Sequence, residues 1–222
     1  MGIITGYIAA VLLVVLLIKF IARKCKLQKL NKALMKAHKY IAFAFLIVSI
    51  IHFVLVIPVL EGRDLLVTIS GIAILVVGLF ITVLCHVIKN KKQNLKLHQV
   101  LSIGILLLLI VHLVVYFIDF GKYIKAIDEI EVTSVDLNYV EDGEYYGEYS
   151  TGYVAARVKV TVDNHAITNV ELIKHINEKG KPAESITDTI KAKQNVKVDA
   201  VSGATNSSKV IMKACENALK NR

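Results

Sequence analysis

The chain contains little proline, glycine or cysteine. Two prolines and 12 glycines among 222 residues exclude a collagen-like or low-complexity protein. The three cysteines, Cys25, Cys85 and Cys215, are far apart and form no CxxC motif, no zinc-ligand spacing and no disulfide framework. Apolar residues are abundant instead. Hydrophobic types make up 55% of the chain, which is too much for a protein whose whole surface faces water.

Acidic residues are scarce in the first half of the chain. Residues 1–120 contain 13 lysines and arginines against 3 acidic residues, a net charge of +10. Residues 121–222 contain 14 against 15, a net charge of −1. The basic half also holds the long apolar runs. A membrane therefore explains the positive charge better than nucleic acid does, and we expect no nucleic-acid partner.

Four apolar runs are long enough to cross a lipid bilayer, which takes about 20 residues. They cover residues 3–22, 40–60, 65–88 and 100–120. Basic residues gather between the first and second runs and between the third and fourth, so the positive-inside rule places both loops in the cytoplasm. We therefore predict a multi-pass protein of the cytoplasmic membrane. Its N-terminus and residues 121–222 are expected outside the cytoplasm.

Four histidines in these runs repeat at a fixed spacing. His38 and His52 are 14 residues apart on the second run, and His98 and His112 are 14 apart on the fourth. Fourteen residues at about 100° each return to nearly the same helix face, about 21 Å further along the axis. Because the two runs point the same way, His38 can lie level with His98, and His52 level with His112. Each pair can provide the two axial nitrogens of a haem b, one near each side of the membrane.

The histidine spacing and topology resemble those of the membrane cytochromes b of the ferric-reductase and NADPH-oxidase type. In that group two helices each provide two histidines to two stacked haems, but this chain lacks the group's cytoplasmic flavin and nicotinamide module. Lys36 and Lys96, beside the inner pair, are candidates to bind haem propionates. Hydrogen-bonded structural histidines are the alternative interpretation, although four at repeated spacing are hard to explain by packing. The role of His86 stays open.

The second half of the chain indicates an α+β domain. Strands are expected at residues 144–150, 153–163 and 166–174. In the second of them, Val158, Val160 and Val162 alternate with polar residues, as in a half-buried strand. Helices are expected at 184–194 and 207–219. The predicted fold class is an α-helical membrane bundle of four transmembrane helices plus a small α+β extracytoplasmic domain. The expected boundaries, listed in order, are 1–120 for the haem-binding bundle, 121–134 for a linker and 135–222 for the outer domain.

A loop of small residues precedes the last expected helix. Residues 199–208 read Asp-Ala-Val-Ser-Gly-Ala-Thr-Asn-Ser-Ser. Small residues let a ligand approach the backbone, and the amides at a helix N-terminus favour an anion such as phosphate. An ordinary helix cap at Asn206 or Ser207 is the alternative interpretation.

The same string resembles the flavinylation signature of FMN-binding domains, Asp-x-x-Ser-Gly-Ala-Thr-x-Ser. Such domains occur in the flavin-carrying subunits of the sodium-translocating NADH:quinone oxidoreductase and of Rnf complexes. The matching residues are Asp199, Ser202, Gly203, Ala204, Thr205 and Ser207. The resemblance implies a covalent FMN, joined to Thr205 through a phosphoester by a flavin transferase. It places Asp199 in the recognition sequence. Ser207 and Ser208 are candidate phosphate contacts, and the role of His175 stays open.

The predicted sites together form a redox chain. We expect electrons to pass from the inner haem to the outer haem and then to FMN, which reduces an acceptor outside the cytoplasm. The protein would then be a membrane oxidoreductase whose donor is a quinol or a cytoplasmic reductase. The sequence specifies neither the donor, nor the acceptor, nor the oligomeric state. Two alternatives remain: a haem-free, membrane-anchored flavoprotein within a larger complex, and a membrane redox sensor.

Overall fold

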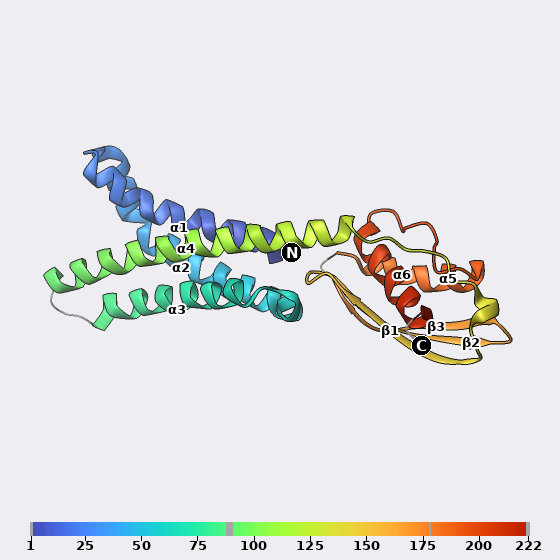
Figure 1. The fold of residues 1–222 in the computed structure, drawn as a ribbon. Coiled ribbons are helices and arrows are strands. Elements are labelled where there is room, and N and C mark those ends of the chain that lie inside the picture. The colour runs from blue at the N-terminus through green and yellow to red at the C-terminus, as the bar shows by residue number, and fades with distance from the viewer. Residues whose placement is uncertain (1, 88–90, 178, 221–222) are drawn as a thin grey trace. The chain divides into compact units, whose positions relative to one another are not determined.

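The computed structural model describes residues 2–87, 91–177 and 179–220. The chain forms two compact units. The first comprises residues up to 57 together with residues 64–117, and the second comprises residues 58–63 together with residues from 118 onward. Figure 1 labels the helices and strands of both units.

The first unit is built from four long helices (Figure 1). They are α1 (Gly2–Lys24), α2 (Gln28–Val56), α3 (Leu65–Val87) and α4 (Lys91–Asp128). A short 3-10 helix, η1 (Ile57–Gly62), follows α2. All four long helices are long and apolar enough to cross a membrane. The predicted helical membrane part is therefore confirmed.

A small set of apolar side chains packs where these helices meet. The buried residues of this cluster are Ala9, Leu13, Phe45, Leu46, Ile74, Ile105 and Leu109, from all four helices. Many other large apolar side chains of the unit are exposed. Exposed apolar side chains all around a helix bundle suit contact with lipid rather than with water.

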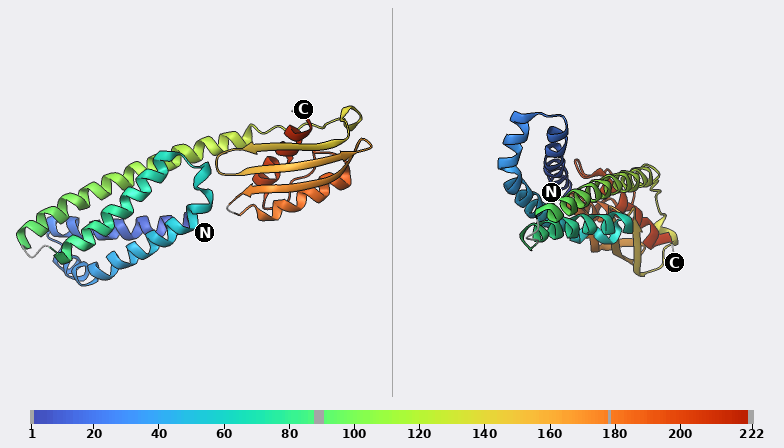
Figure 2. Two further views of the ribbon diagram at one scale, coloured as in Figure 1. Left: turned by 90° about the horizontal axis from the view of Figure 1, so that it is seen from below. Right: turned by 90° about the vertical axis from the view of Figure 1, so that its left-hand side faces the viewer.

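The second unit contains a three-stranded antiparallel sheet in the order β1-β2-β3. The strands are β1 (Gly143–Ser150), β2 (Ala155–Asp163) and β3 (Ala166–Ile176), and the helices are α5 (Ile186–Lys193) and α6 (Thr205–Lys220). Both helices lie on the same face of the sheet (Figures 1 and 2). Asn164 and His165 adopt positive φ angles of 52° and 58°, as a two-residue type I′ turn between β2 and β3 requires. The predicted α+β domain is confirmed.

The helix α6 packs directly against β1. A Cβ atom at Gly147 of β1 would overlap the carbonyl oxygen of Ala214 in α6, so this close approach requires glycine. Cys215 is fully buried beside this contact. Burial raises the pKa of the Cys215 thiol to about 12, so the thiol stays protonated and unreactive.

The last two turns of α4 belong to the core of the second unit. Tyr123 and Ile127 are buried there, and Ile130, just beyond the helix, is buried with them. Tyr123 and Ile127 are four residues apart, so they share one helix face. Residues 121–134, expected as a linker, are thus the end of a helix followed by chain that packs into the core.

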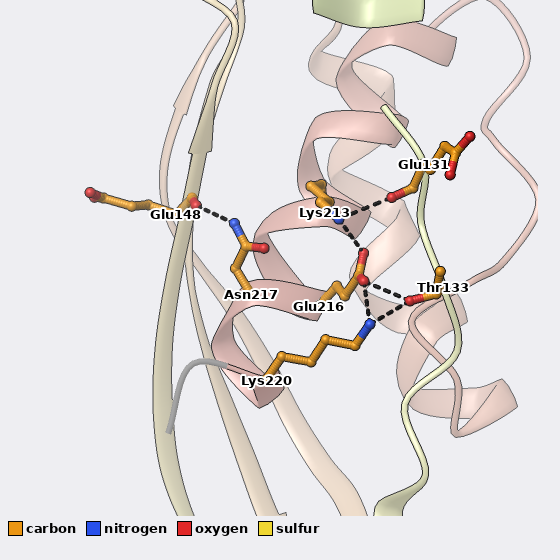
Figure 3. Close-up of polar contacts among 7 residues, drawn as sticks. All are labelled: Glu131, Thr133, Glu148, Lys213, Glu216, Asn217 and Lys220. Carbon is orange, nitrogen blue, oxygen red and sulfur yellow. Dashed lines mark hydrogen bonds and ion pairs between the residues drawn. The ribbon is translucent and has the colours of Figure 1, made fainter. Parts of the chain in front are cut away.

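A buried carboxylate ties the segment after α4 to α6 (Figure 3). The side chain of Glu216 is only 3% exposed, and it accepts hydrogen bonds from Lys213 at 2.9 Å and Lys220 at 2.7 Å. The hydroxyl of Thr133 donates to the same carboxylate at 2.7 Å, and Lys213 also reaches the carbonyl oxygen of Glu131 at 3.0 Å. Burial alone would raise the pKa of Glu216, but the hydrogen bonds outweigh it and lower this pKa from 4.5 to about 2.

The depressed pKa predicts how the stability of this unit depends on pH. The Glu216 carboxylate contributes about 3 kcal/mol to the free energy of unfolding above pH 4.5, and this contribution is lost as the pH falls from 4.5 to about 2. Glu216→Gln should therefore destabilise α6 by about that amount at pH 7 and by clearly less at pH 3. Urea unfolding of the detergent-solubilised protein, monitored by hydrogen exchange of α6 peptides, measures the difference in the free energy of unfolding between the wild type and the variant at each pH.

Glu129→Gln is the matched control for this prediction. Glu129 pairs with Lys125 at 3.7 Å, but both side chains are largely exposed, so the substitution should change the free energy of unfolding by less than about 1 kcal/mol. An equal decrease in the free energy of unfolding of both variants would contradict the stabilising role of the Glu216 carboxylate. A decrease in Glu216→Gln that does not depend on pH would contradict it as well.

Candidate functional site

His38 of α2 and His98 of α4 face each other in the first unit. Their ring centres are 6.0 Å apart, and the ring planes are inclined at 74°. An imidazole nitrogen binds a transition metal at about 2 Å and the ring centre lies roughly 1 Å beyond it, so two imidazoles on one metal have centres about 6 Å apart. The separation in the structure matches this value, and the two rings lie edge to face.

A cavity of about 270 Å³ adjoins this inner pair. Both histidines line it, together with mostly apolar side chains from all four long helices. Lys19 and Arg23 of α1 also line the cavity. Lys36 and Lys96, which the sequence suggested as propionate partners, are exposed and do not line it. Among the described residues, the cations that line this cavity therefore come from α1.

His52 and His112 lie further along α2 and α4, and each is bonded to a neighbouring helix. The Nδ1 atom of His52 is 2.9 Å from the carbonyl oxygen of Gly2 in α1. The Nδ1 atom of His112 is 3.0 Å from the hydroxyl of Ser70 in α3. With Nδ1 engaged, the Nε2 atom of each ring remains to bind a metal.

The histidines have too few neighbouring ligands to form a site for a metal ion without a cofactor. Among the residues that the structure describes, no group of three or more His, Cys, Asp or Glu side chains could hold a metal ion. A haem iron needs only two ligands from the protein, because the macrocycle supplies the others. His86 lies in α3, but its side chain is outside the described part of the chain.

The predicted flavin loop of the second unit leads into the N-terminus of α6. Gly203 has a φ angle of +76°, a conformation that L side chains rarely adopt, and α6 begins two residues later at Thr205. The first backbone bond into the helix runs from the Ser208 N–H to the carbonyl oxygen of Ala204 at 3.0 Å. Within the described chain, the amides of residues 205–207 have no backbone acceptor. Free amides at a helix N-terminus attract an anion.

The hydroxyl groups of this loop differ in their surroundings. Thr205 is exposed, and its hydroxyl makes no hydrogen bond to a residue that the structure describes. Ser208 is fully buried, where its hydroxyl accepts from the Val201 N–H and donates to the carbonyl oxygen of Ala204, both at 3.0 Å. Ser207 is buried as well, and its hydroxyl lies 3.1 Å from the Nε2 atom of His175. Both serine hydroxyls are thus engaged within the domain.

Residues 152–220 match the family model of the FMN-binding domain. The second unit therefore contains an FMN-binding domain. The match covers β2, β3, α5, α6 and the whole loop at 199–208. No curated protein and no solved structure matches the chain.

The exposed residues of the loop in this FMN-binding domain are open to a modifying enzyme. Ser202 and Gly203 are exposed, whereas Ala204 is buried beneath the helix start. The side chain of Asp199 is 97% exposed and pairs with Lys193 at 3.2 Å. An exposed acidic residue six positions before Thr205 can be read by a partner protein, and the exposed threonine hydroxyl can react. The residues present therefore fit an FMN joined to Thr205.

A buried hydrogen-bond chain supports the first turn of α6. His175 lies 3.1 Å from Ser207 through Nε2 and 3.1 Å from the carboxylate of Glu184 through Nδ1. A Cβ atom at Gly180 would overlap the Ser207 hydroxyl oxygen, so this backbone covers the serine. The order serine, histidine, carboxylate is that of a hydrolase triad, but here the covered serine has no access to a substrate. These hydrogen bonds position the start of α6 instead.

Aromatic residues from the end of α4 also contact this turn. The side-chain amide of Asn206 donates to the Tyr123 hydroxyl oxygen at 2.7 Å. Tyr123 stacks on Tyr153 with ring centres 4.8 Å apart, and Phe120 lies 5.7 Å from both rings. Sequence reasoning missed these residues, since nothing in the local pattern links Tyr123 to Asn206 across 83 positions.

Proposed function

We propose that the protein carries electrons across the cytoplasmic membrane. A donor in the cytoplasm or the membrane would be oxidised, two b-type haems would conduct, and a covalent FMN would reduce an acceptor outside the cytoplasm. One observation carries the proposal: the same chain combines an FMN-binding domain with four histidines at a repeated spacing of 14 residues on two membrane helices. Haem and flavin supply the reversible redox chemistry, and the protein holds and orients them.

The membrane residues have distinct tasks in this proposal. His38 and His98 would hold the iron of an inner haem through their imidazole nitrogens, and Lys19 and Arg23 would supply positive charge for its carboxylates. A buried anion needs such partners, because leaving a carboxylate unpaired in an apolar cavity is costly. His52 and His112 would hold the iron of an outer haem in the same way. Because α2 and α4 each carry one histidine of both pairs, the same two helices position both sites.

Thr205 is the proposed attachment point of FMN. Its hydroxyl oxygen would form a bond to phosphorus while a phosphoanhydride bond of the flavin donor breaks and the hydroxyl proton leaves to a base of the flavin transferase. The resulting phosphodiester carries a negative charge, which the amides of residues 205–207 and the dipole of α6 would stabilise. The exposure of Thr205 supports this role.

We place the FMN-binding domain outside the cytoplasm on the basis of charge. The connection between α1 and α2 is rich in lysine and arginine, and the positive-inside rule assigns such loops to the cytoplasm. With four crossings, the end of α4 then emerges on the opposite side from that connection. A covalent link suits this location, because no flavin pool outside the cell would replace a lost cofactor.

One purified sample tests the proposal. A pyridine haemochromogen spectrum and intact mass should show two haems and one covalent FMN per chain, with the mass increase on the peptide that contains Thr205. Flavin without haem would support a haem-free carrier instead. Both cofactors without electron transfer, from a reductant inside sealed vesicles to an impermeant acceptor outside, would support a redox sensor.

A further inference from the structure

The hydroxyl of Ser70 is a hydrogen-bond acceptor toward His112. Ser70 is 7% exposed and lies on α3, where its oxygen is 2.6 Å from the carbonyl oxygen of Leu66 and 3.1 Å from that of Val67. A carbonyl oxygen can only accept, so the single hydroxyl proton of Ser70 is committed to its own helix. The lone pairs of Ser70 then face the Nδ1 atom of His112 at 3.0 Å, and this nitrogen must donate.

The Nδ1 atom of His52 must also donate a hydrogen bond, but to a different kind of partner. Its Nδ1 atom lies 2.9 Å from the carbonyl oxygen of Gly2 on α1, which also accepts a hydrogen bond from Thr5 at 2.8 Å. Since that oxygen can only accept, the Nδ1 atom of His52 carries the proton. Both outer imidazoles are therefore held as the tautomer with a protonated Nδ1. Each keeps an unprotonated Nε2 with a lone pair available for a metal.

Glycines on the two supporting helices make room for these rings. A Cβ atom at Gly6 of α1 would lie 2.9 Å from the Cε1 atom of His52. A Cβ atom at Gly71 of α3 would lie 3.2 Å from the Cε1 atom of His112. Each outer histidine thus meets an acceptor and a glycine on a helix that carries none of the four repeated histidines. Two unrelated helices provide the same arrangement, which plain packing does not require.

We propose that α1 and α3 orient the outer histidine pair as haem ligands, and that Ser70 is a positioning residue for the outer haem. The inference rests on the proposed function, because it assumes that His52 and His112 bind iron. A hydrogen bond from Nδ1 to an acceptor makes an imidazole a stronger electron donor through Nε2. The ferric state of the outer haem is then favoured, and its reduction potential is lowered relative to a site without the bond.

Ser70→Ala tests this role. The variant removes the hydroxyl acceptor of His112 and leaves its backbone contact with Val67, so we expect the outer haem to bind about 10-fold more weakly and its reduction potential to rise. The inner haem should keep its potential, which also reports that the bundle is folded. Ser70→Thr keeps the hydroxyl and should restore both properties. Thr68→Ala on the same helix is the matched control, because the Thr68 side chain makes no hydrogen bond within the described chain.

Redox titration of the haem absorbance and electron paramagnetic resonance of the oxidised protein are the measurements. A shift confined to one of two haems, reversed in Ser70→Thr, is the expected result. Two haems with unchanged potentials, spectra and content in Ser70→Ala would overturn the inference and leave the proposed function standing. Equal effects on both haems would also overturn it, since they indicate a general structural role. Wild-type protein without haem would refute the proposed function itself, and this inference with it.

Discussion

Thr205→Ala is expected to abolish covalent flavin and to leave the haem content unchanged. The exposed hydroxyl of Thr205 stands at the N-terminus of α6, whereas the hydroxyls of Ser207 and Ser208 are engaged inside the domain. Alanine lacks the oxygen that forms the phosphoester, and no neighbour in the helix can replace it. The domain should stay folded, because an exposed substitution typically changes the free energy of unfolding by about 0.5 kcal/mol or less.

In-gel flavin fluorescence after denaturation measures this result. Thr205→Ser, which keeps a hydroxyl, should retain fluorescence. Thr168→Ala, a change of another exposed threonine of the same domain, should leave it at the wild-type level. Fluorescence of Thr205→Ala at the wild-type level would place the attachment elsewhere.

The same variant also tests whether FMN is the site from which electrons leave the protein. In sealed vesicles of Thr205→Ala, the haems should still be reduced from the cytoplasmic side, while reduction of an impermeant outer acceptor should slow sharply. A wild-type rate of acceptor reduction would mean that FMN is not the exit, and the site at His52 and His112 would have to take that role.

His52→Ala and His112→Ala are each expected to remove one haem and to spare the other. We propose both residues as ligands of the outer haem, and loss of either imidazole would leave its iron with one protein ligand. The haem content per chain should fall to about half, because the inner ligands His38 and His98 are untouched and the cofactor sites are separate. The pyridine haemochromogen assay counts the haem that remains.

His165→Ala provides the control for these variants. His165 lies in the FMN-binding domain, where its Nδ1 atom contacts the carbonyl oxygen of Val140 at 3.0 Å, so its loss should not change the haem content. Unchanged haem in both membrane variants would reject the pairing. Loss of both haems in either variant would indicate that the two sites fold as one.

The sequence predicts those parts of the molecule that depend on local periodicity. The spacing of 14 residues marks the four histidines because an α-helix brings such positions to one face, and β2 is marked by its alternating valines. What holds the rings is not periodic. The Gly2 carbonyl and the Ser70 hydroxyl reach their histidines across 50 and 42 positions, through helix packing that no local pattern specifies.

Local sequence patterns also do not predict where the FMN-binding domain begins or which residues contact its flavin loop. The sequence predicts that the membrane bundle ends at residue 120, but α4 continues to Asp128, and its residues Tyr123 and Ile127 pack into the core of the second unit. Ser207 was a candidate phosphate contact, and the structure gives its hydroxyl a partner, His175, that lies 32 positions away. That candidate role remains a prediction, since it depends on whether the hydroxyl leaves His175 when a phosphate is present.

The contrast among the loop hydroxyls bears on the regioselectivity of modification. Four hydroxyl residues crowd into seven positions, namely Ser202, Thr205, Ser207 and Ser208. Ser207 and Ser208 are buried, and Ser202 precedes the turn at which the free amides of α6 converge. The folded domain therefore presents one acceptor oxygen where a phosphate would be stabilised. A transferase with broad tolerance for serine and threonine would still yield a single product, and every chain would carry its flavin at the same place.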